Sequence, residues 1–74
     1  MAFGKVLAEV RRERRLTQDR LADLSGFDRT TISLLERGKR SPTLDTIFRL
    51  CLSLDISLSK FARLMEDTMD SNNV

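Results

Sequence analysis

The stretch from Thr17 to Gly38 constrains the fold more than any other part of the chain. It contains two apolar patterns of helical spacing, and each follows a residue suited to capping a helix, Thr17 or Asp28. The side-chain oxygens of such residues accept hydrogen bonds from the free N–H groups of a first helical turn. Gly26 lies between the two patterns and can adopt the left-handed conformation that ends a helix. The stretch therefore predicts two short helices joined by a turn so tight that the helices must cross.

Three more helices are expected in the rest of the chain. Before the central stretch, apolar residues repeat at i, i+3, i+4 and i+7, which predicts one face turned toward a core: Phe3, Val6, Leu7 and Val10. After it, Thr43 and Ser57 are caps that precede two further apolar patterns. The expected stripes are Leu44, Ile47, Phe48 and Cys51, followed by Leu58, Phe61, Ala62, Leu64 and Met65. The five expected helices cover, to within a residue or two, 2–14, 18–25, 29–37, 44–53 and 58–69.

The length of 74 residues favours one small domain, residues 1–69, with a polar tail at 70–74 that frays. A chain this short buries about 60% of the surface that it exposes when unfolded, so helix packing and dimerisation must supply its stability. The single cysteine, Cys51, cannot form an internal disulfide and lies on an apolar stripe, which favours an inert buried thiol over a redox sensor. A lone thiol suits the cytoplasm, and neither a signal peptide nor a membrane-spanning run is recognisable.

The charge is distributed unevenly along the chain. Residues 1–42 contain ten basic and six acidic residues, a net charge of +4, whereas residues 43–74 contain three basic and five acidic residues, a net charge of −2. The basic half includes the central stretch. Such asymmetry is typical of a surface that faces phosphates, although a solvated helix face would give the same count.

Catalytic chemistry finds little support in the sequence. The chain has no histidine, so its one cysteine lacks an imidazole that would activate it. It has no glycine-rich phosphate loop and no cluster of metal ligands. The carboxylates are scattered among arginines, as ordinary surface ion pairs are. We therefore expect no enzymatic activity, no cofactor and no metal.

A series of short motifs extends from residue 4 to about residue 54. In chain order they are Gly4, Leu7, Val10 and Arg11, then Leu16-Thr17-Gln18, Leu21-Ala22, Ser25-Gly26, Thr31-Ile32-Ser33, Leu35-Glu36-Arg37-Gly38-Lys39 and Pro42-Thr43-Leu44. In this order and at this spacing, the series resembles the lambda-repressor/Cro-like helix-turn-helix proteins, the small DNA-binding regulators of bacteria and phages. The resemblance implies an all-α domain of five helices that binds double-stranded DNA.

The helix expected at 29–37 carries the candidate base-reading residues. At about 100° per residue, five side chains lie on or near its outward face: Arg29, Thr30, Ser33, Leu34 and Arg37. Arg29 has a planar donor fork that suits a guanine edge, and a phosphate contact is the alternative. By resemblance, Arg29, Thr30 and Leu34 occupy base-reading positions. Leu34 is expected to be exposed and to touch a thymine methyl, with a place in the core as the alternative.

Other residues are expected to bind phosphates or to hold the helices together. By resemblance, Gln18 bonds a phosphate at the N-terminus of its helix. The further phosphate contacts expected beside the third helix are Arg37, Lys39 and Arg40. The resemblance also implies an ion pair between Arg11 and Glu36, which we expect to be partly buried and to fix the first helix against the third.

The C-terminal helices, residues 43–69, carry more apolar residues than a small core can bury. This surplus favours a two-fold homodimer, and the alternative is that the last helix only covers the core of a monomer. The expected interface residues are Leu52, Leu58, Phe61 and Met65. The sequence thus predicts a cytoplasmic, dimeric transcription regulator, a repressor at a near-palindromic operator. The rival hypothesis is an antitoxin that binds a toxin and represses its own operon. A toxin or RNA polymerase is therefore the protein partner to consider, and no membrane contact is expected.

Overall fold

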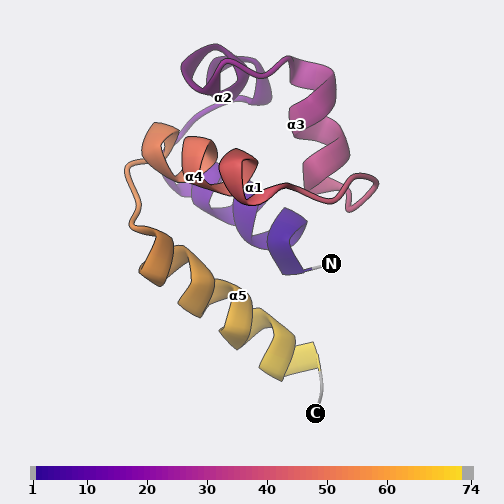
Figure 1. Cartoon of the computed structure of the whole chain (residues 1–74), viewed down its shortest axis with the longest axis vertical. Helices are drawn as coiled ribbons and strands as arrows, with labels where there is room; N and C mark the ends of the chain where they lie inside the picture. Colours follow the sequence, from indigo (N-terminus) through magenta and orange to yellow (C-terminus); the bar gives the residue numbers. More distant parts are fainter. Residues whose placement is uncertain (1, 73–74) are drawn as a thin grey trace.

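The computed structural model describes residues 2–72, which form five helices (Figure 1). They are α1 (Ala2–Glu13), α2 (Gln18–Ser25), α3 (Arg29–Glu36), α4 (Leu44–Ser53) and α5 (Leu58–Asn72). In Figure 1, α2 and α3 lie at one end of the molecule, α1 and α4 cross its middle, and α5 lies at the other end. No strand occurs in this part of the chain, so the predicted all-α fold is confirmed.

The expected caps determine where the helices begin. Thr17 and Asp28 each accept a hydrogen bond from the backbone N–H three residues later, at 3.0 Å and 2.7 Å. Thr43 and Ser57 cap α4 and α5 in the same way. Gly26 has a φ of +81°, and its N–H donates to the carbonyl of Ala22, which ends α2. The turn that follows is short, and α2 and α3 pack directly against each other.

Two helix ends differ from the expected positions. α3 ends at Glu36, with Arg37 as its C-cap and Gly38 following at a φ of +71°. α5 continues beyond Met69 to Asn72, so the helix includes part of the tail that was expected to fray. No glycine or proline follows Met69, and helix propagation adds one backbone hydrogen bond per residue even where the apolar stripe stops. Residues 73–74 lie outside the described part of the chain.

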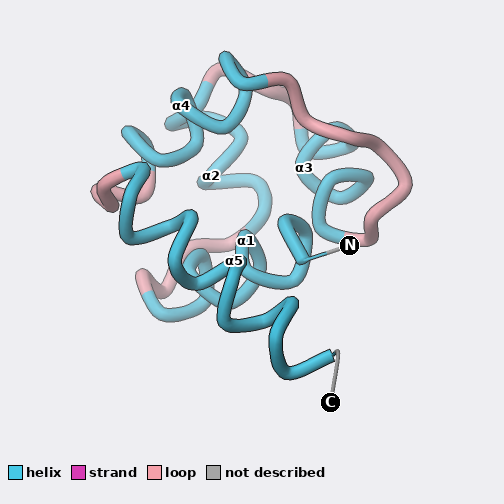
Figure 2. Tube along the Cα trace, turned by 60° about the horizontal axis from the view of Figure 1, so that its bottom comes forward, coloured by secondary structure: helices cyan, strands magenta, loops and turns pink. Residues whose placement is uncertain are grey.

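The hydrophobic core is built around α1. Its predicted stripe is confirmed, because Phe3, Val6, Leu7 and Val10 are all at most 1% exposed. α5 packs along α1, as Figure 2 shows, and places the ring centroid of Phe61 at 5.6 Å from that of Phe3. The other side of the core comes from α2, α3 and α4.

The apolar stripe expected on α4 is only partly correct. Leu44 and Phe48 are 63% and 43% exposed, whereas Leu50, Cys51 and Leu54 are buried. α4 is apolar around most of its circumference, so two overlapping stripes fit a helical period, and Cys51 belongs to both. The packing of α4 against α2 and α5 buries the later stripe. Burial also raises the pKa of the Cys51 thiol above its ordinary value, which agrees with an inert thiol.

The residues expected at a dimer interface lie in different environments. Phe61 is 0% exposed and packs against Phe3, so this prediction is wrong and Phe61 is a core residue of the monomer. Leu58 and Met65 are half-buried and pack against the core. Leu52 is 82% exposed and is the one residue of the four that lies fully at the surface.

α1 approaches the end of α3 closely at Gly4. A Cβ atom at this position would lie 2.4 Å from the backbone oxygen of Leu35 and 2.6 Å from that of Glu36. Both neighbours are backbone atoms, which cannot rotate away as a side chain would. Gly4 therefore sets how near α1 lies to α3.

Replacing Gly4 by alanine should destabilise the protein by about 1–3 kcal/mol, because the new methyl group forces the two helices apart. The sign of the change in unfolding free energy is informative, because glycine to alanine at a solvent-exposed position inside a helix stabilises a protein by about 1 kcal/mol. Urea unfolding measures the effect. The control is Lys5→Ala on the exposed side of α1, which should stay within about 0.5 kcal/mol of the parent protein. A Gly4→Ala protein as stable as the parent would contradict the close approach.

Candidate functional site

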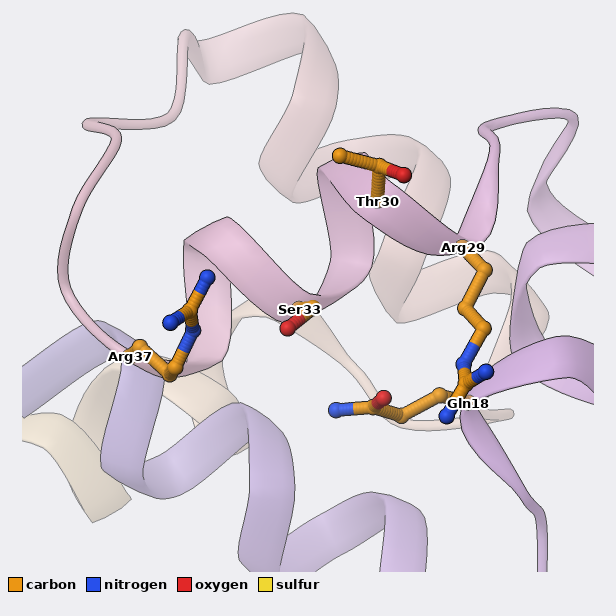
Figure 3. Close-up of a pocket in the computed structure, with 5 residues that line it drawn as sticks. All are labelled: Gln18, Arg29, Thr30, Ser33 and Arg37. Carbon is orange, nitrogen blue, oxygen red and sulfur yellow. The ribbon is translucent and has the colours of Figure 1, made fainter.

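The outward face of α3 forms an open depression beside α2 (Figure 3). The depression has a volume of about 280 Å³ and is lined by Gln18, Arg29, Thr30, Ser33 and Arg37. Figure 3 shows Arg29 and Arg37 near the two ends of α3, with Ser33 between them and the side chain of Gln18 facing them from α2. The structure therefore brings together five of the eight residues expected to contact DNA.

The lining of this depression consists of hydrogen-bonding groups and cations. Two guanidinium groups, one amide and two hydroxyls lie in it, and no carboxylate is among the lining groups. Such a set donates hydrogen bonds to anions and to polar edges. The depression is shallow and open, so it suits a large ligand that lies across α3 better than a small enclosed substrate.

An exposed ion pair links the beginning of α3 to the first turn of α2. The Nε atom of Arg29 lies 3.6 Å from Oδ1 of Asp19. The two side chains are 66% and 73% exposed, so the pair contributes only about 0.2–1 kcal/mol to stability. The pair places the guanidinium of Arg29 beside the first turn of α2.

A second, largely buried network lies at the other end of α3. Nε and Nη2 of Arg11 donate to the two carboxylate oxygens of Glu36 at 2.6 Å and 3.1 Å. The side chains of Arg11 and Glu36 are only 11% and 6% exposed. Nη1 of Arg11 donates to the carbonyl of Leu16 at 2.8 Å, and Nε2 of Gln18 donates to Oε1 of Glu36 at 3.0 Å. The network therefore joins α1, α2 and α3 at one point.

The side-chain amide of Gln18 is consequently held in one orientation, which its position at the start of a helix does not suggest. One amide hydrogen is committed to Glu36, and the second remains for a ligand, because an amide nitrogen carries two donors. The amide lies in the depression with its orientation already set.

Three of the expected DNA contacts lie outside the depression. Leu34 is half-buried on the Thr30 side of α3, which matches neither the fully exposed nor the core alternative. Lys39 and Arg40 are exposed in the loop after α3. Nη1 of Arg40 lies within 3.4 Å of the Thr31 hydroxyl, so Arg40 lies beside the opposite flank of α3.

The carboxylate of Asp28, the N-cap of α3, is stabilised in its charged form. Hydrogen bonds from Thr31 lower the pKa of Asp28 below its ordinary value of 3.8, and the positive charge of Arg40 lowers it further. The Asp28 carboxylate therefore stays ionised near neutral pH, where it fixes the first turn of α3.

Arg49 of α4 is a structural contact that the sequence did not reveal. Its Nη2 donates to the carbonyl of Ser25 at 3.0 Å, and its guanidinium lies 4.2 Å from the ring centroid of Phe27. A Cβ atom on Gly26 would lie 2.8 Å from the same Nη2. Gly26 therefore allows the left-handed backbone conformation and also leaves room for the Arg49 side chain. Through Arg49, α4 contacts the turn between α2 and α3. An arginine on a largely apolar helix carries no local signal of such a contact.

Within residues 2–72, no cluster of histidine, cysteine or carboxylate side chains has the arrangement of a metal site. None of the helices in this range combines the length and the apolar character needed to cross a bilayer.

Comparison with known proteins gives a consistent result. The sequence profile of the helix-turn-helix family matches residues 7–61. The HTH-type transcriptional regulator PuuR of Escherichia coli is 41% identical over 61 residues, which cover 82% of this chain but 33% of PuuR. The chain thus spans only about a third of that relative. Control protein C.SmaI of Serratia marcescens is 39% identical over 64 residues, which cover 81% of this chain and 76% of C.SmaI.

A solved structure supports the same relationship. The restriction-modification controller protein C.AhdI from Aeromonas hydrophila has a TM-score of 0.78 to this chain at 40% sequence identity. The match covers 81% of this chain and 91% of C.AhdI. This chain and C.AhdI are therefore similar both in sequence and in the arrangement of their helices.

The Glu36→Gln substitution tests the network behind the depression. It should destabilise the protein by about 3 kcal/mol, because the buried Arg11 cation loses its counter-charge. Thermal unfolding measures the effect. Asp19→Asn breaks the exposed pair and serves as the control, with a loss below about 1 kcal/mol. An unchanged melting temperature for Glu36→Gln would show that the pair does not behave as a buried one.

Proposed function

The chain belongs to the helix-turn-helix family, and we propose that it is a sequence-specific DNA-binding regulator of transcription. The polar face of α3 is the observation that carries this proposal. With its side chains an α-helix is about 10–12 Å across, so the eight-residue α3 fits a major groove about 12 Å wide. The groups on this face are donors and cations, as the edges of bases and the phosphates beside them require.

The proposed contacts divide into base-reading and phosphate-binding groups. Arg29, Thr30 and Ser33 lie on the face that would enter the groove, and half-buried Leu34 beside them offers an apolar contact to a thymine methyl. Gln18 lines this face from α2 and Arg37 lies at the C-terminal end of α3, whereas Lys39 and Arg40 follow in the loop. We infer that these four bind phosphates on either side of the groove.

Repression at an operator fits this arrangement better than the antitoxin hypothesis. The relatives described above are named as a transcriptional regulator and as control proteins. The proposed ligand is DNA, so we also place the protein in the cytoplasm. The role is binding without catalysis.

Selection of binding sites from random DNA tests the proposal, and titration of the best site against salt tests the phosphate contacts. We expect an enriched motif and a steep loss of affinity with salt. Alanine at Arg37, Lys39 or Arg40 should reduce the slope of log K against log salt by about 0.9 each. Lys60→Ala on α5, at the opposite end of the molecule from α3, is the matched control and should leave the slope unchanged. Absence of an enriched motif would contradict sequence-specific binding.

We further propose that the protein binds DNA as a homodimer with Leu52 in the interface. Leu44, Phe48 and Leu52 follow one another at four-residue steps along α4, and all three are exposed. A row of large apolar side chains on a small domain indicates a surface that another protein covers. A two-fold dimer would place two α3 helices about 34 Å apart on a near-palindromic site.

Replacement of Leu52 by lysine should convert the dimer to a monomer without unfolding it, because the side chain is already exposed in the monomer. Static light scattering at micromolar concentration should give twice the 8.5 kDa chain mass for the parent protein and the single chain mass for the variant. Leu24→Lys on α2, which also replaces an exposed leucine, is the control and should remain dimeric. A monomeric parent protein would refute the homodimer.

A further inference from the structure

We propose that Asp19 is a positioning residue that sets the base specificity of the DNA-binding surface by orienting Arg29. The inference rests on the proposed function, in which Arg29 reads a base. Asp19 lies in the first turn of α2 and Arg29 opens α3, and the contact between them bridges the two helices at the edge of the depression. Asp19 itself does not line the depression, so its effect on base preference would pass through Arg29.

The atoms that form the pair decide what Arg29 can still do. Asp19 approaches Nε of Arg29, at 3.6 Å, so the two terminal nitrogens Nη1 and Nη2 remain at the end of the side chain. Recognition of guanine uses two parallel donors to O6 and N7, which the terminal pair supplies. The carboxylate therefore lies beside the edge of the guanidinium that a bidentate pair with guanine leaves free.

Restraint of Arg29 matters because a free arginine has many rotamers. Without an anchor, the guanidinium can swing to a nearby phosphate, which gives affinity for any sequence but no discrimination. An anchored side chain loses less conformational entropy on forming the bidentate pair. The negative charge of Asp19 also repels phosphates, so it disfavours the non-specific arrangement.

The residues that precede Asp19 and Arg29 in the chain are each held by a side-chain hydrogen bond. The residue before Asp19 is Gln18, which is hydrogen-bonded to Glu36 at the far end of α3. The residue before Arg29 is Asp28, whose side chain caps α3. Gln18 thus ties the first turn of α2 to the C-terminal end of α3, and Asp19 in the same turn faces its N-terminal end. This distinguishes Asp19 from an acidic residue that merely stabilises a helix N-terminus.

The test compares affinities for the selected DNA site with those for sites in which single bases are changed, at one salt concentration. Arg29→Ala identifies the base that Arg29 reads, because its preference at that position should fall from about 5- to 150-fold to near unity. Asp19→Asn should lower the preference at the same position by about 1.4- to 5-fold, the range of an exposed ion pair. It should raise the affinity for random-sequence DNA, since a negative charge near the phosphates is removed. In the Arg29→Ala background, Asp19→Asn should cause no further loss of preference.

Asp23→Asn is the matched control. Asp23 lies one turn later on α2, is exposed, and forms no ion pair with any described residue. It removes the same charge and should leave the preference unchanged. If Asp19→Asn leaves the preference intact where Arg29→Ala abolishes it, or if Asp23→Asn lowers it equally, the inference is wrong and the proposed function stands. If Arg29→Ala changes the preference at no position, the base-reading role of Arg29 fails, and the inference fails with it.

Discussion

The junction between α1 and the end of α3 is the constraint on which the DNA-facing surface depends. Two contacts of different kinds meet at Glu36. Its backbone oxygen leaves no room for a Cβ on Gly4, and its carboxylate accepts hydrogen bonds from Nε and Nη2 of Arg11. Gly4 and Arg11 are seven residues apart on one face of α1, about 10 Å along the axis. α1 is thus held at two separated points against the C-terminal end of α3, which fixes how that end of α3 is seated on the core.

A buried ion pair is costly to desolvate, and its geometry shows how the cost is offset here. All three guanidinium nitrogens of Arg11 donate hydrogen bonds, and the Glu36 carboxylate receives a further one from Gln18. Every polar group at the junction thus has a partner, which is the condition under which a buried pair is tolerated. The same arrangement orients the amide of Gln18 before any ligand arrives. One set of hydrogen bonds therefore both stabilises the contact between the helices and preorganises the surface.

Local chemistry was predictable from the sequence, whereas contacts between distant elements were not. Thr17, Gly26 and Asp28 act within a few residues of themselves, so their capping and turn roles could be predicted directly. The Arg11–Glu36 pair was suggested by family resemblance, since no local pattern links residues that far apart. The stripe on α4 was ambiguous because Cys51 fits two helical faces, and only packing against α2 and α5 selects one. Phe61 and Arg49 illustrate the same limit, because each is placed by a partner on another helix. The specific contacts of the depression residues with DNA remain predictions.

The residues of α3 that pack inward differ from those that face outward, and this has a consequence for how proteins of this kind diversify. Ile32, Leu35 and Glu36 hold the helix in place, and Arg29, Thr30 and Ser33 face outward. Because the helical period interleaves these two sets, neighbouring positions in the sequence are under different structural constraints. The outward positions can change with little cost to folding, since exposed substitutions usually alter stability by no more than about 0.5 kcal/mol. A lineage can therefore acquire a new DNA target through a few substitutions while the scaffold persists, and regulators with the same architecture can diverge to control unrelated genes.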